Sequence, residues 1–269
     1  MEPLLRTENV AKRYESGGVF GPRQKVQALN GVTFSIFPGT TLALVGPSGS
    51  GKSTLAFCLA CLEPVSSGRI WFAGTEVTAL EAQQQRASRP SIQMVFQDPA
   101  SSLNPRMSAL ELVTEPLNIQ NRFEKRERRN RACDLLQRVG LAPEKAAQRP
   151  DEFSGGQRQR IAIARALALE PKLLILDEAL SALDCSVQAQ IANLLFDLQT
   201  SLGLTYVFIT HDLAMAAHLS DEILVMDRGQ IVEMGAAPSV LNAPQHAVTQ
   251  RLLLAAPGVS NMALAPRAV

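Results

Sequence analysis

The stretch TLALVGPSGSGKST, residues 41–54, decides the fold class of this chain. Its first five residues form a continuous apolar run, which is typical of a central parallel strand buried on both faces. The next eight residues match the pattern G-x-x-x-x-G-K-[ST], and a helical segment follows them. Glycines let such a loop turn its backbone N–H groups toward phosphate oxygens, and the helix adds the positive end of its dipole. The stretch therefore predicts a strand–loop–helix unit that binds nucleotide phosphates.

Two side chains of this loop have predicted tasks. Lys52 is expected to reach the β- and γ-phosphates, and the hydroxyl of Ser53 is expected to hold Mg²⁺. The residues predicted to surround the nucleotide are Gly46, Pro47, Ser48, Gly49, Ser50, Gly51, Lys52, Ser53 and Thr54. The alternative is a glycine-rich turn with an incidental lysine, which does not explain the buried strand before the loop and the helix after it.

Outward from this loop, strand and helix patterns alternate, which predicts an α/β fold with helices on the faces of a sheet. Strands are predicted at 28–37, 41–45, 68–74, 92–96, 172–177 and 204–210, with a hairpin around Arg228-Gly229 at 222–235. Helices are predicted at 121–140, 157–169, 186–203 and 212–220. The organisation predicted from these elements is a nucleotide-binding core at 1–98 and 161–245, a helical insertion at 99–160, and a short helix with a tail at 246–269.

Acidic and amide side chains follow predicted strands. Asp177 and Glu178 end the strand LLILDE, and ligands in open α/β folds bind at the carboxyl edge of the sheet. Asp177 suits Mg²⁺ binding, and Glu178 suits polarising an attacking water. Gln97 could ligate Mg²⁺, and His211 could sense the γ-phosphate or orient the water. The bland alternatives are a helix N-cap for the two acids and ordinary surface positions for Gln97 and His211.

A second glycine pair opens a helix at FSGGQRQR, residues 153–160. Ser154 and the backbone N–H groups of Gly155 and Gly156 form a second candidate anion-binding helix start. It lies far from the first loop in sequence, so a second subunit could supply it across a two-fold interface and enclose one γ-phosphate. The alternative is an ordinary N-cap that contains glycine.

Composition narrows the classes of function. The formal net charge is +1, so no global field steers the chain to nucleic acid or acidic lipid. The start lacks the pattern of a signal peptide, and no run of 18 apolar residues exists. Cys58 and Cys61 form a C-x-x-C inside an apolar helical run with no second ligand pair, which favours two buried thiols over a metal site. Metal binding by His218 or His246 is likewise disfavoured.

The order of these motifs resembles that of the ATP-binding subunits of ABC transporters. It runs from GPSGSGKS at 46–53 through Gln97, SGGQ at 154–157, LLILDE at 173–178 and SALD at 181–184 to His211. The resemblance covers nearly the whole chain. It implies a P-loop NTPase (RecA-like) core with an antiparallel β subdomain and a helical insertion, and an ATPase that uses ATP and Mg²⁺.

The resemblance also implies roles for residues whose function their own pattern leaves open. Tyr14 would lie against adenine. The SGGQ residues Ser154, Gly155, Gly156 and Gln157, together with Asp184, would contact the ATP of a partner subunit. Gln97 would sense whether the γ-phosphate is present and transmit this state to other parts of the protein.

A closer resemblance is to the ATPases of dipeptide, oligopeptide and nickel importers, through QDPASSLNPRMS, EALSALDCSVQAQI, FITHDL and the segment 15–25. It implies a peripheral subunit at the cytoplasmic face of the inner membrane, two membrane-spanning permease subunits, a second and related ATP-binding subunit, and indirectly a substrate-binding protein. Within the group, the resemblance favours nickel or a metal complex slightly over peptides. A membrane-subunit helix is expected to bind beside Gln97, around residues 101–106.

The alternative from another class is a soluble ABC-type ATPase that acts on nucleic acid or ribosomes. The segment RFEKRERRNR, residues 122–131, could contact phosphates. The acids and amides within it and the small net charge favour a solvated helix face, so no nucleic-acid partner is predicted.

Overall fold

The computed structural model describes residues 2–16, 24–98 and 102–255, which form two compact units. The first unit combines Met1–Arg89 with Thr205–Val269, and the second is Pro90–Leu204. Parts of two predicted regions lie outside the described residues: most of the segment 15–25, and the tail after residue 255. The α/β fold with a phosphate-loop core is confirmed, whereas the predicted boundaries of the helical insertion stay a prediction.

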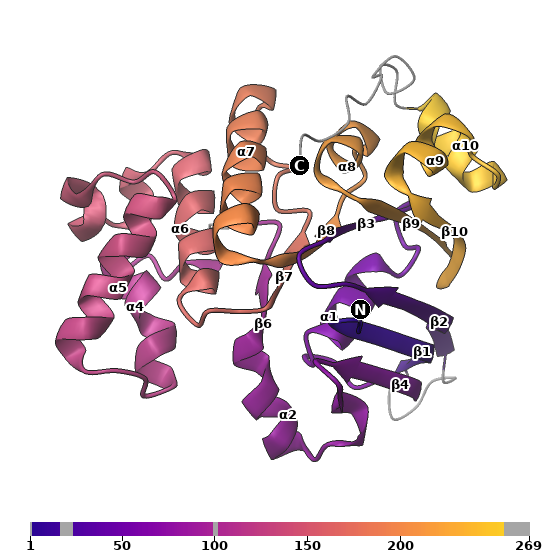
Figure 1. The fold of residues 1–269 in the computed structure, drawn as a ribbon, viewed down its shortest axis with the longest axis horizontal. Coiled ribbons are helices and arrows are strands. Elements are labelled where there is room, and N and C mark those ends of the chain that lie inside the picture. Colours follow the sequence, from indigo (N-terminus) through magenta and orange to yellow (C-terminus); the bar gives the residue numbers. More distant parts are fainter. Residues whose placement is uncertain (1, 17–23, 99–101, 256–269) are drawn as a thin grey trace. The chain divides into compact units, whose positions relative to one another are not determined.

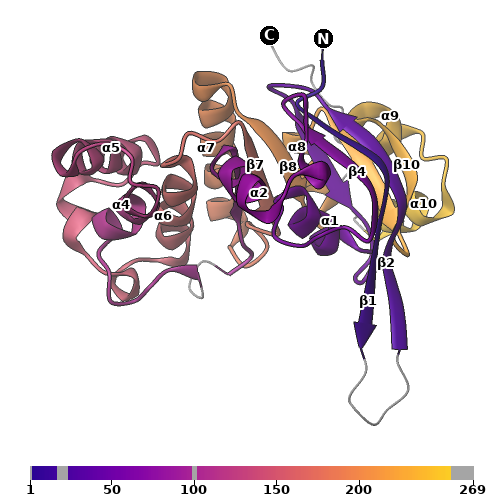
Figure 2. The ribbon, with the colours of Figure 1, turned by 90° about the horizontal axis from the view of Figure 1, so that it is seen from below.

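The first unit contains a four-stranded antiparallel sheet in the order β2-β1-β4-β5. Its strands are β1 (Leu5–Ser16), β2 (Gln24–Ile36), β4 (Ser67–Phe72) and β5 (Thr75–Glu76), and Figure 2 shows the long β1–β2 pair. The sequence did not predict β1. Its pairing with β2 shifts register three times and its Asn9 has a φ of 48°, so the alternation of apolar and polar residues is interrupted.

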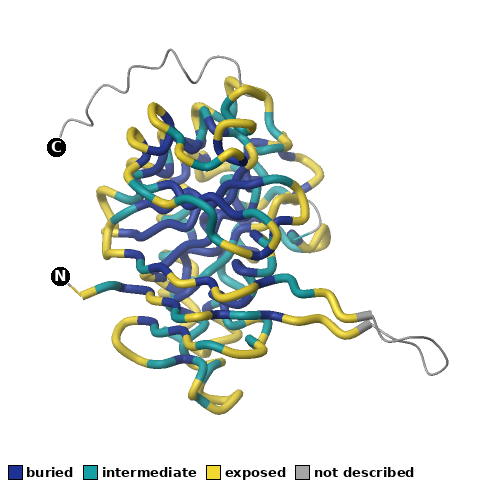
Figure 3. Tube along the Cα trace, turned by 90° about the vertical axis from the view of Figure 1, so that its right-hand side faces the viewer, coloured by how far each residue is buried: buried dark blue, intermediate teal, exposed yellow. Residues whose placement is uncertain are grey.

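The first unit also holds four neighbouring strands in the order β10-β9-β3-β8. They are β3 (Thr41–Val45), β8 (Thr205–Ile209), β9 (Glu222–Asp227) and β10 (Gln230–Ala236). β3 runs parallel to both β8 and β9, and β9 and β10 form the predicted hairpin. Every residue of β3 and β8 is buried, as a central strand requires, and such buried stretches are dark blue in Figure 3.

Helices complete the first unit. They are α1 (Lys52–Leu59), α2 (Ala82–Ser88), α8 (Leu213–Leu219), α9 (Ala237–Asn242) and α10 (Ala247–Leu254). Apolar side chains of α8, α9 and α10 pack in one cluster with residues of β3 and β9. The short C-terminal helix was predicted, whereas α2 and α9 were not, because seven and six residues are too short for a clear helical period.

The second unit has two parallel strands, β6 (Ile92–Val95) and β7 (Leu173–Asp177). Its long helices are α4 (Ala109–Ile119), α5 (Lys125–Arg138), α6 (Gly155–Leu167) and α7 (Cys185–Leu202). Figure 1 shows α4, α5 and α6 packed together. The sequence analysis missed α4, whose Pro116 resembles a helix breaker although a capping box at Ser108 starts the helix. No helix in the described ranges is long and apolar enough to cross a bilayer.

Candidate nucleotide-binding site

The predicted phosphate loop leaves the carboxyl end of β3 and opens α1. It wraps around its own lysine: Lys52 Nζ donates to the carbonyl oxygens of Gly46 (2.9 Å) and Pro47 (3.0 Å). Lys52 is only 7% exposed, so its charge is held inside the loop. The first residue of α1 thus carries a fixed cation at the positive end of the helix dipole, and both favour an anion there.

Two of the loop glycines are required by close backbone contacts. A Cβ on Gly46 would lie 2.2 Å from the carbonyl oxygen of Met226, and one on Gly51 would lie 2.5 Å from that of Ala28. Gly51 also has a φ of 104°, which L side chains rarely adopt. The loop is therefore held tightly between β9 and β2, in a shape that only glycine allows.

A third glycine, Gly229, holds the loop from the β9–β10 turn. Its N–H donates to Ser50 O (2.9 Å), and its carbonyl oxygen accepts from Asn30 N (2.8 Å). The turn is predicted from the sequence but its role is not, because only tertiary contact brings Gly229 to the phosphate loop. The hydroxyl of Ser50 is buried and has no hydrogen-bond partner among the described residues. This buried polar atom, the glycine cradle and the enclosed Lys52 fit the phosphates of a nucleotide.

His211 leaves the same sheet edge as the phosphate loop. Leu44 of β3 is opposite Ile209 of β8 in the parallel pairing, so the residues just after both strands emerge side by side. His211 is exposed, and the next residue caps α8. This edge is the predicted position of the site, whereas the task of His211 stays a prediction.

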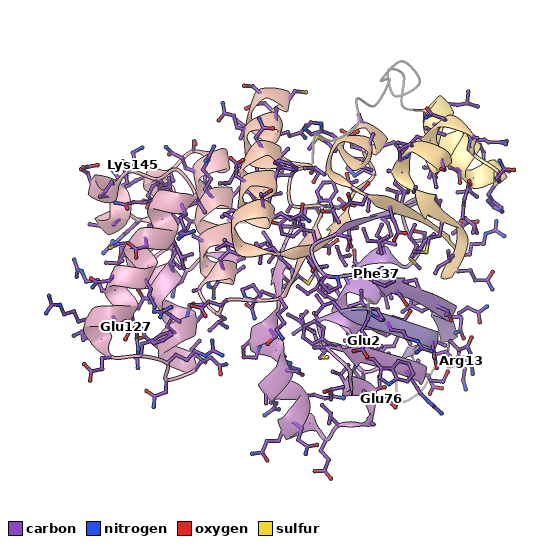
Figure 4. The ribbon with its side chains drawn as sticks, in the orientation of Figure 1. Glu2, Arg13, Phe37, Glu76, Glu127 and Lys145 are labelled. Atoms are coloured by element: carbon purple, nitrogen blue, oxygen red, sulfur yellow. The ribbon has the colours of Figure 1, made fainter. Side chains whose placement is uncertain are left out.

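Tyr14 lies on β1, where it is opposite Val26 of β2. The residue is 37% exposed, and the ammonium of Lys12 lies 4.9 Å from the centroid of its ring. Arg13, labelled in Figure 4, bonds through Nε to Gln27 Oε1 (2.5 Å). Tyr14 pairs with β2, and Ala28 of the same strand contacts the phosphate loop. This position suits an exposed ring that stacks on the base of a nucleotide.

In the second unit, the predicted carboxylates and Gln97 share one sheet edge. Val95 of β6 is opposite Leu176 of β7, so Gln97 and Asp177 leave neighbouring parallel strands. Asp177 is buried, and Glu178 has a φ of 46°. A non-glycine residue in this left-handed region costs about 1–3 kcal/mol, and such residues cluster at functional sites.

Ser181 connects Gln97 to the strand end and was not singled out from the sequence. Gln97 Nε2 donates to Ser181 Oγ (3.4 Å), and Ser181 Oγ donates to the carbonyl oxygen of Glu178 (2.9 Å). Its position as the first residue of the SALD motif is the sequence feature from which a role for Ser181 could have been predicted. The connection gives Gln97 a contact path to the residue predicted to polarise water.

The SGGQ stretch opens α6 as predicted. Ser154 is the N-cap, its hydroxyl accepts from Gln157 N (3.4 Å), and Gln157 Oε1 accepts in return from Ser154 N (3.1 Å). Gly156 is buried, and a Cβ there would lie 2.5 Å from Cγ1 of Val187. Asp184 caps α7 by accepting from Val187 N (2.9 Å). Val187 thus joins the starts of α6 and α7, which carry the two predicted trans-acting motifs.

Both C-x-x-C thiols are free, but only Cys58 is buried as predicted, because Cys61 follows the end of α1 and is partly exposed. Cys58 is buried at the end of α1, and its burial raises the pKa of the thiol to about 11. No group of three or more potential metal ligands occurs within the described ranges. The candidate residues thus lie in the two units separately: the phosphate loop and His211 in the first, and Gln97, the two carboxylates and the starts of α6 and α7 in the second.

Comparison with known proteins identifies the family. Residues 29–181 match the model of the ABC transporter family. The chain is 46% identical to the dipeptide transport ATP-binding protein DppF of Escherichia coli (strain K12), over 95% of this chain and 77% of the relative. It is also 46% identical to the di/tripeptide transport ATP-binding protein DppF of Pseudomonas aeruginosa (strain UCBPP-PA14), over 96% of this chain and 80% of that protein.

Two further similarities agree. A glutathione import ATP-binding protein, GsiA, of Escherichia coli O157:H7 is 47% identical over 95% of this chain and 41% of its own length. A dimeric ATP-binding cassette in a post-hydrolysis state, bound to ADP and Pi, has a TM-score of 0.77 at 33% identity, covering 87% of this chain and 98% of the cassette. The chain belongs to the ABC transporter family, in its dipeptide and oligopeptide importer group, and is an ATPase whose ATP hydrolysis is coupled to transport.

Proposed function

We propose that this chain powers the uptake of dipeptides or oligopeptides through separate membrane-spanning permease subunits. The observation that carries this proposal is the 46% identity to two peptide-transport ATPases over at least 95% of the chain. Nickel or a metal complex is the alternative cargo. The names of these relatives refer to peptides and glutathione, which favours a peptide cargo over nickel. The protein would act as a peripheral subunit at the cytoplasmic face of the inner membrane.

Within one chain, the phosphate loop would bind ATP, with Lys52 neutralising the β- and γ-phosphates. Mg²⁺ would be held by oxygen atoms of Ser53, Gln97 and Asp177 and would neutralise phosphate charge. Glu178 would take a proton from the attacking water, since its carboxylate follows the buried strand β7. His211 would orient that water, and Tyr14 would stack on adenine.

Between chains, the helix start of α6 would bind the γ-phosphate held by a second ATP-binding subunit, through Ser154, Gly155, Gly156 and Gln157, with Asp184 beside them. A two-fold arrangement makes two such composite sites. We expect the second ATP-binding subunit to be a different but related chain. Closure of this dimer transmits work only if it favours one permease state over another. The permease would receive cargo from a substrate-binding protein.

A groove of about 410 Å³ in the second unit suits a permease helix. Phe96 and Ile119 line it with 40% and 72% of their surface exposed. Arg165 braces its wall by donating to Ser102 O (2.8 Å) and Glu115 Oε2 (2.6 Å). Of the predicted segment 101–106, Ser102 lines this groove and residue 101 lies outside the described residues.

The basic segment supports transport rather than the nucleic-acid alternative. Arg128 donates to the carbonyl oxygens of Arg122 and Phe123, and Arg131 bonds to Glu127 and Glu170. These guanidinium groups already serve contacts within the second unit, which leaves fewer cations for phosphates.

The test is the Glu178→Gln variant. It should bind ATP but hydrolyse it about 10²–10⁴-fold more slowly, because the general base is lost. Purified with Mg-ATP from detergent-solubilised membranes, it should bring two multi-span proteins and a second ATPase. Ile119→Asp on the Glu178→Gln background is the matched variant and should lose the multi-span proteins while still binding ATP. Wild-type turnover in Glu178→Gln would remove Glu178 from the mechanism.

The cargo requires a separate measurement. Cells that lack this chain should lose uptake of a labelled dipeptide and keep uptake of labelled nickel. The reverse result would make nickel the cargo, and capture of ribosomal or DNA-associated proteins without a membrane subunit would contradict transport altogether.

A further inference from the structure

A second pocket of about 380 Å³ lies in the second unit, and its lining residues include none of those assigned to ATP or to the permease groove. It is formed by α5, by the segment that follows α6, and by the end of α7 with the residues after it. Its volume falls in the range of small-molecule sites. Neither the proposed mechanism nor the groove for the permease helix uses it.

Part of the lining of this pocket is aliphatic. Leu135, Leu167 and Leu202 line it, and Leu202 leaves 41% of its surface exposed at the end of α7. Exposed leucine surface inside a concave site is what an apolar ligand group would cover. These leucines therefore favour a molecule with an aliphatic side chain.

Charged residues of both signs also line the pocket. Asp134 and Arg138 are four residues apart on α5, an arrangement in which side chains usually pair, yet neither side chain has an ion pair or hydrogen bond with any described residue. Arg131 and Glu170, by contrast, are bound to each other at 2.6 Å, and Glu127, labelled on α5 in Figure 4, bonds to the same arginine. One carboxylate and one guanidinium thus remain available at the pocket.

The backbone adds to this pattern. α7 and α6 both end at the pocket, and helix C-termini favour a positively charged group. Glu170, in the turn after α6, has a φ of 54° without being glycine, a strained conformation of the kind found at ligand clamps. A ligand ammonium therefore matches Asp134 and the helix ends, and a ligand carboxylate matches Arg138.

We propose that this pocket binds a zwitterionic molecule with an aliphatic side chain, an amino acid or a short peptide, and that its occupancy regulates ATP hydrolysis. The two helices that end at the pocket begin at Ser154 and at Asp184, the motifs assigned to the partner's ATP. Gly156 packs against Val187 with no room for a Cβ, so the two helix starts are fixed to each other. A ligand that binds between the C-terminal ends of α6 and α7 therefore contacts the same two helices whose N-terminal ends carry these motifs.

The binding site stands on the pocket chemistry alone, whereas its use as feedback by an imported peptide rests on the proposed function. The probe is L-leucyl-L-leucine, titrated calorimetrically into the full chain. Its controls are the N-acetylated, C-amidated dipeptide, which carries no terminal charge, and hexanoate, which has no ammonium. We expect the zwitterion to bind and both controls to bind about tenfold more weakly or not at all.

Variants locate the site. Arg138→Glu and Leu202→Asp should each weaken binding of the dipeptide by about tenfold or more, while Arg129→Glu, an exposed change on the same helix outside the pocket, should not. The dipeptide should also change the ATPase rate of the wild type but not that of Arg138→Glu, with circular dichroism showing that the variants remain folded.

Several results would overturn the proposal. No heat of binding, equal binding of the capped and uncapped dipeptides, or an equal loss in Arg129→Glu would each remove the site. Binding without any change in ATPase rate would remove the regulation. Failure of dipeptide uptake in cells, with these binding results intact, would contradict the proposed cargo and not the pocket.

Discussion

The two glycine-containing helix starts of this protein are built in opposite ways. In the phosphate loop, Gly46, Gly49 and Gly51 all have positive φ, and Gly51 caps α1 without a side-chain hydrogen bond. At the start of α6, Gly155 and Gly156 are helical, and the Ser154 side chain provides the cap. Close backbone neighbours demand glycine at Gly46 and Gly51 in the first case, whereas a neighbouring side chain demands it at Gly156 in the second. Glycine therefore lets the phosphate loop pack against neighbouring backbone in one unit, and lets the starts of α6 and α7 pack together in the other.

The largest effect should come from Gly51→Ala. The new Cβ meets the Ala28 carbonyl oxygen, which is backbone and cannot move away, so ATP affinity should fall by about 100-fold or more. Gly49→Ala is the control, because its φ is also positive but nothing lies within 4 Å of its Cβ. Binding of a fluorescent ATP analogue checks this. Equal losses in the two variants would mean that φ and not the close contact matters.

Gly156→Ala should have a smaller effect that can be repaired. Its Cβ meets a valine side chain, so we expect a loss of about 1–3 kcal/mol in the free energy of unfolding and a reduced hydrolysis rate with unchanged ATP binding. Adding Val187→Ala should restore both. Gly155→Ala, whose Cβ would be 3.5 Å from Leu183, is the matched control. If the double variant stays as impaired as the single one, Gly156 is needed for something other than packing.

Ser154→Ala should be the mildest change. It removes the side-chain cap of α6, which costs about 1 kcal/mol of stability, and leaves ATP binding by the same chain intact. Urea unfolding and nucleotide binding measure the two quantities. Hydrolysis should fall as well if the serine contacts the partner's ATP. An unchanged hydrolysis rate alongside the stability loss would reduce Ser154 to a structural cap.

The Cys58 thiol can report on α1 in these variants. Because burial raises its pKa to about 11, only about 0.1% of it is thiolate at pH 8, so alkylation should be slow. Cys185, exposed at the start of α7, should react first. Gly51→Ala should speed up Cys58 labelling and leave Cys185 unchanged, as site-resolved mass spectrometry would show. Unaltered Cys58 labelling would mean that the strained loop leaves α1 in place.

Sequence reasoning was most successful where a strand is buried on both sides. The strands β3, β7 and β8 and the helix α7 lie within a residue or two of the predicted ranges, because continuous apolar runs and turn residues have clear limits. It missed β1, whose register shifts break the alternation, and α4, whose proline conceals a capped helix. The contributions of Gly229 and Ser181 could not be read locally, since each acts on a loop distant in sequence.

The sequence by itself determined the phosphate loop, the strand-end carboxylates, the second helix start and the family, because these depend on residue types at fixed short spacings. Tertiary structure alone decided which glycines are irreplaceable, that Ser181 joins Gln97 to the strand end of Glu178, and that α6 and α7 end in one pocket with charges of both signs. The physical reason is that close contacts and pockets form between segments far apart in the chain. The spacing of residues within one segment does not predict how close two such segments lie.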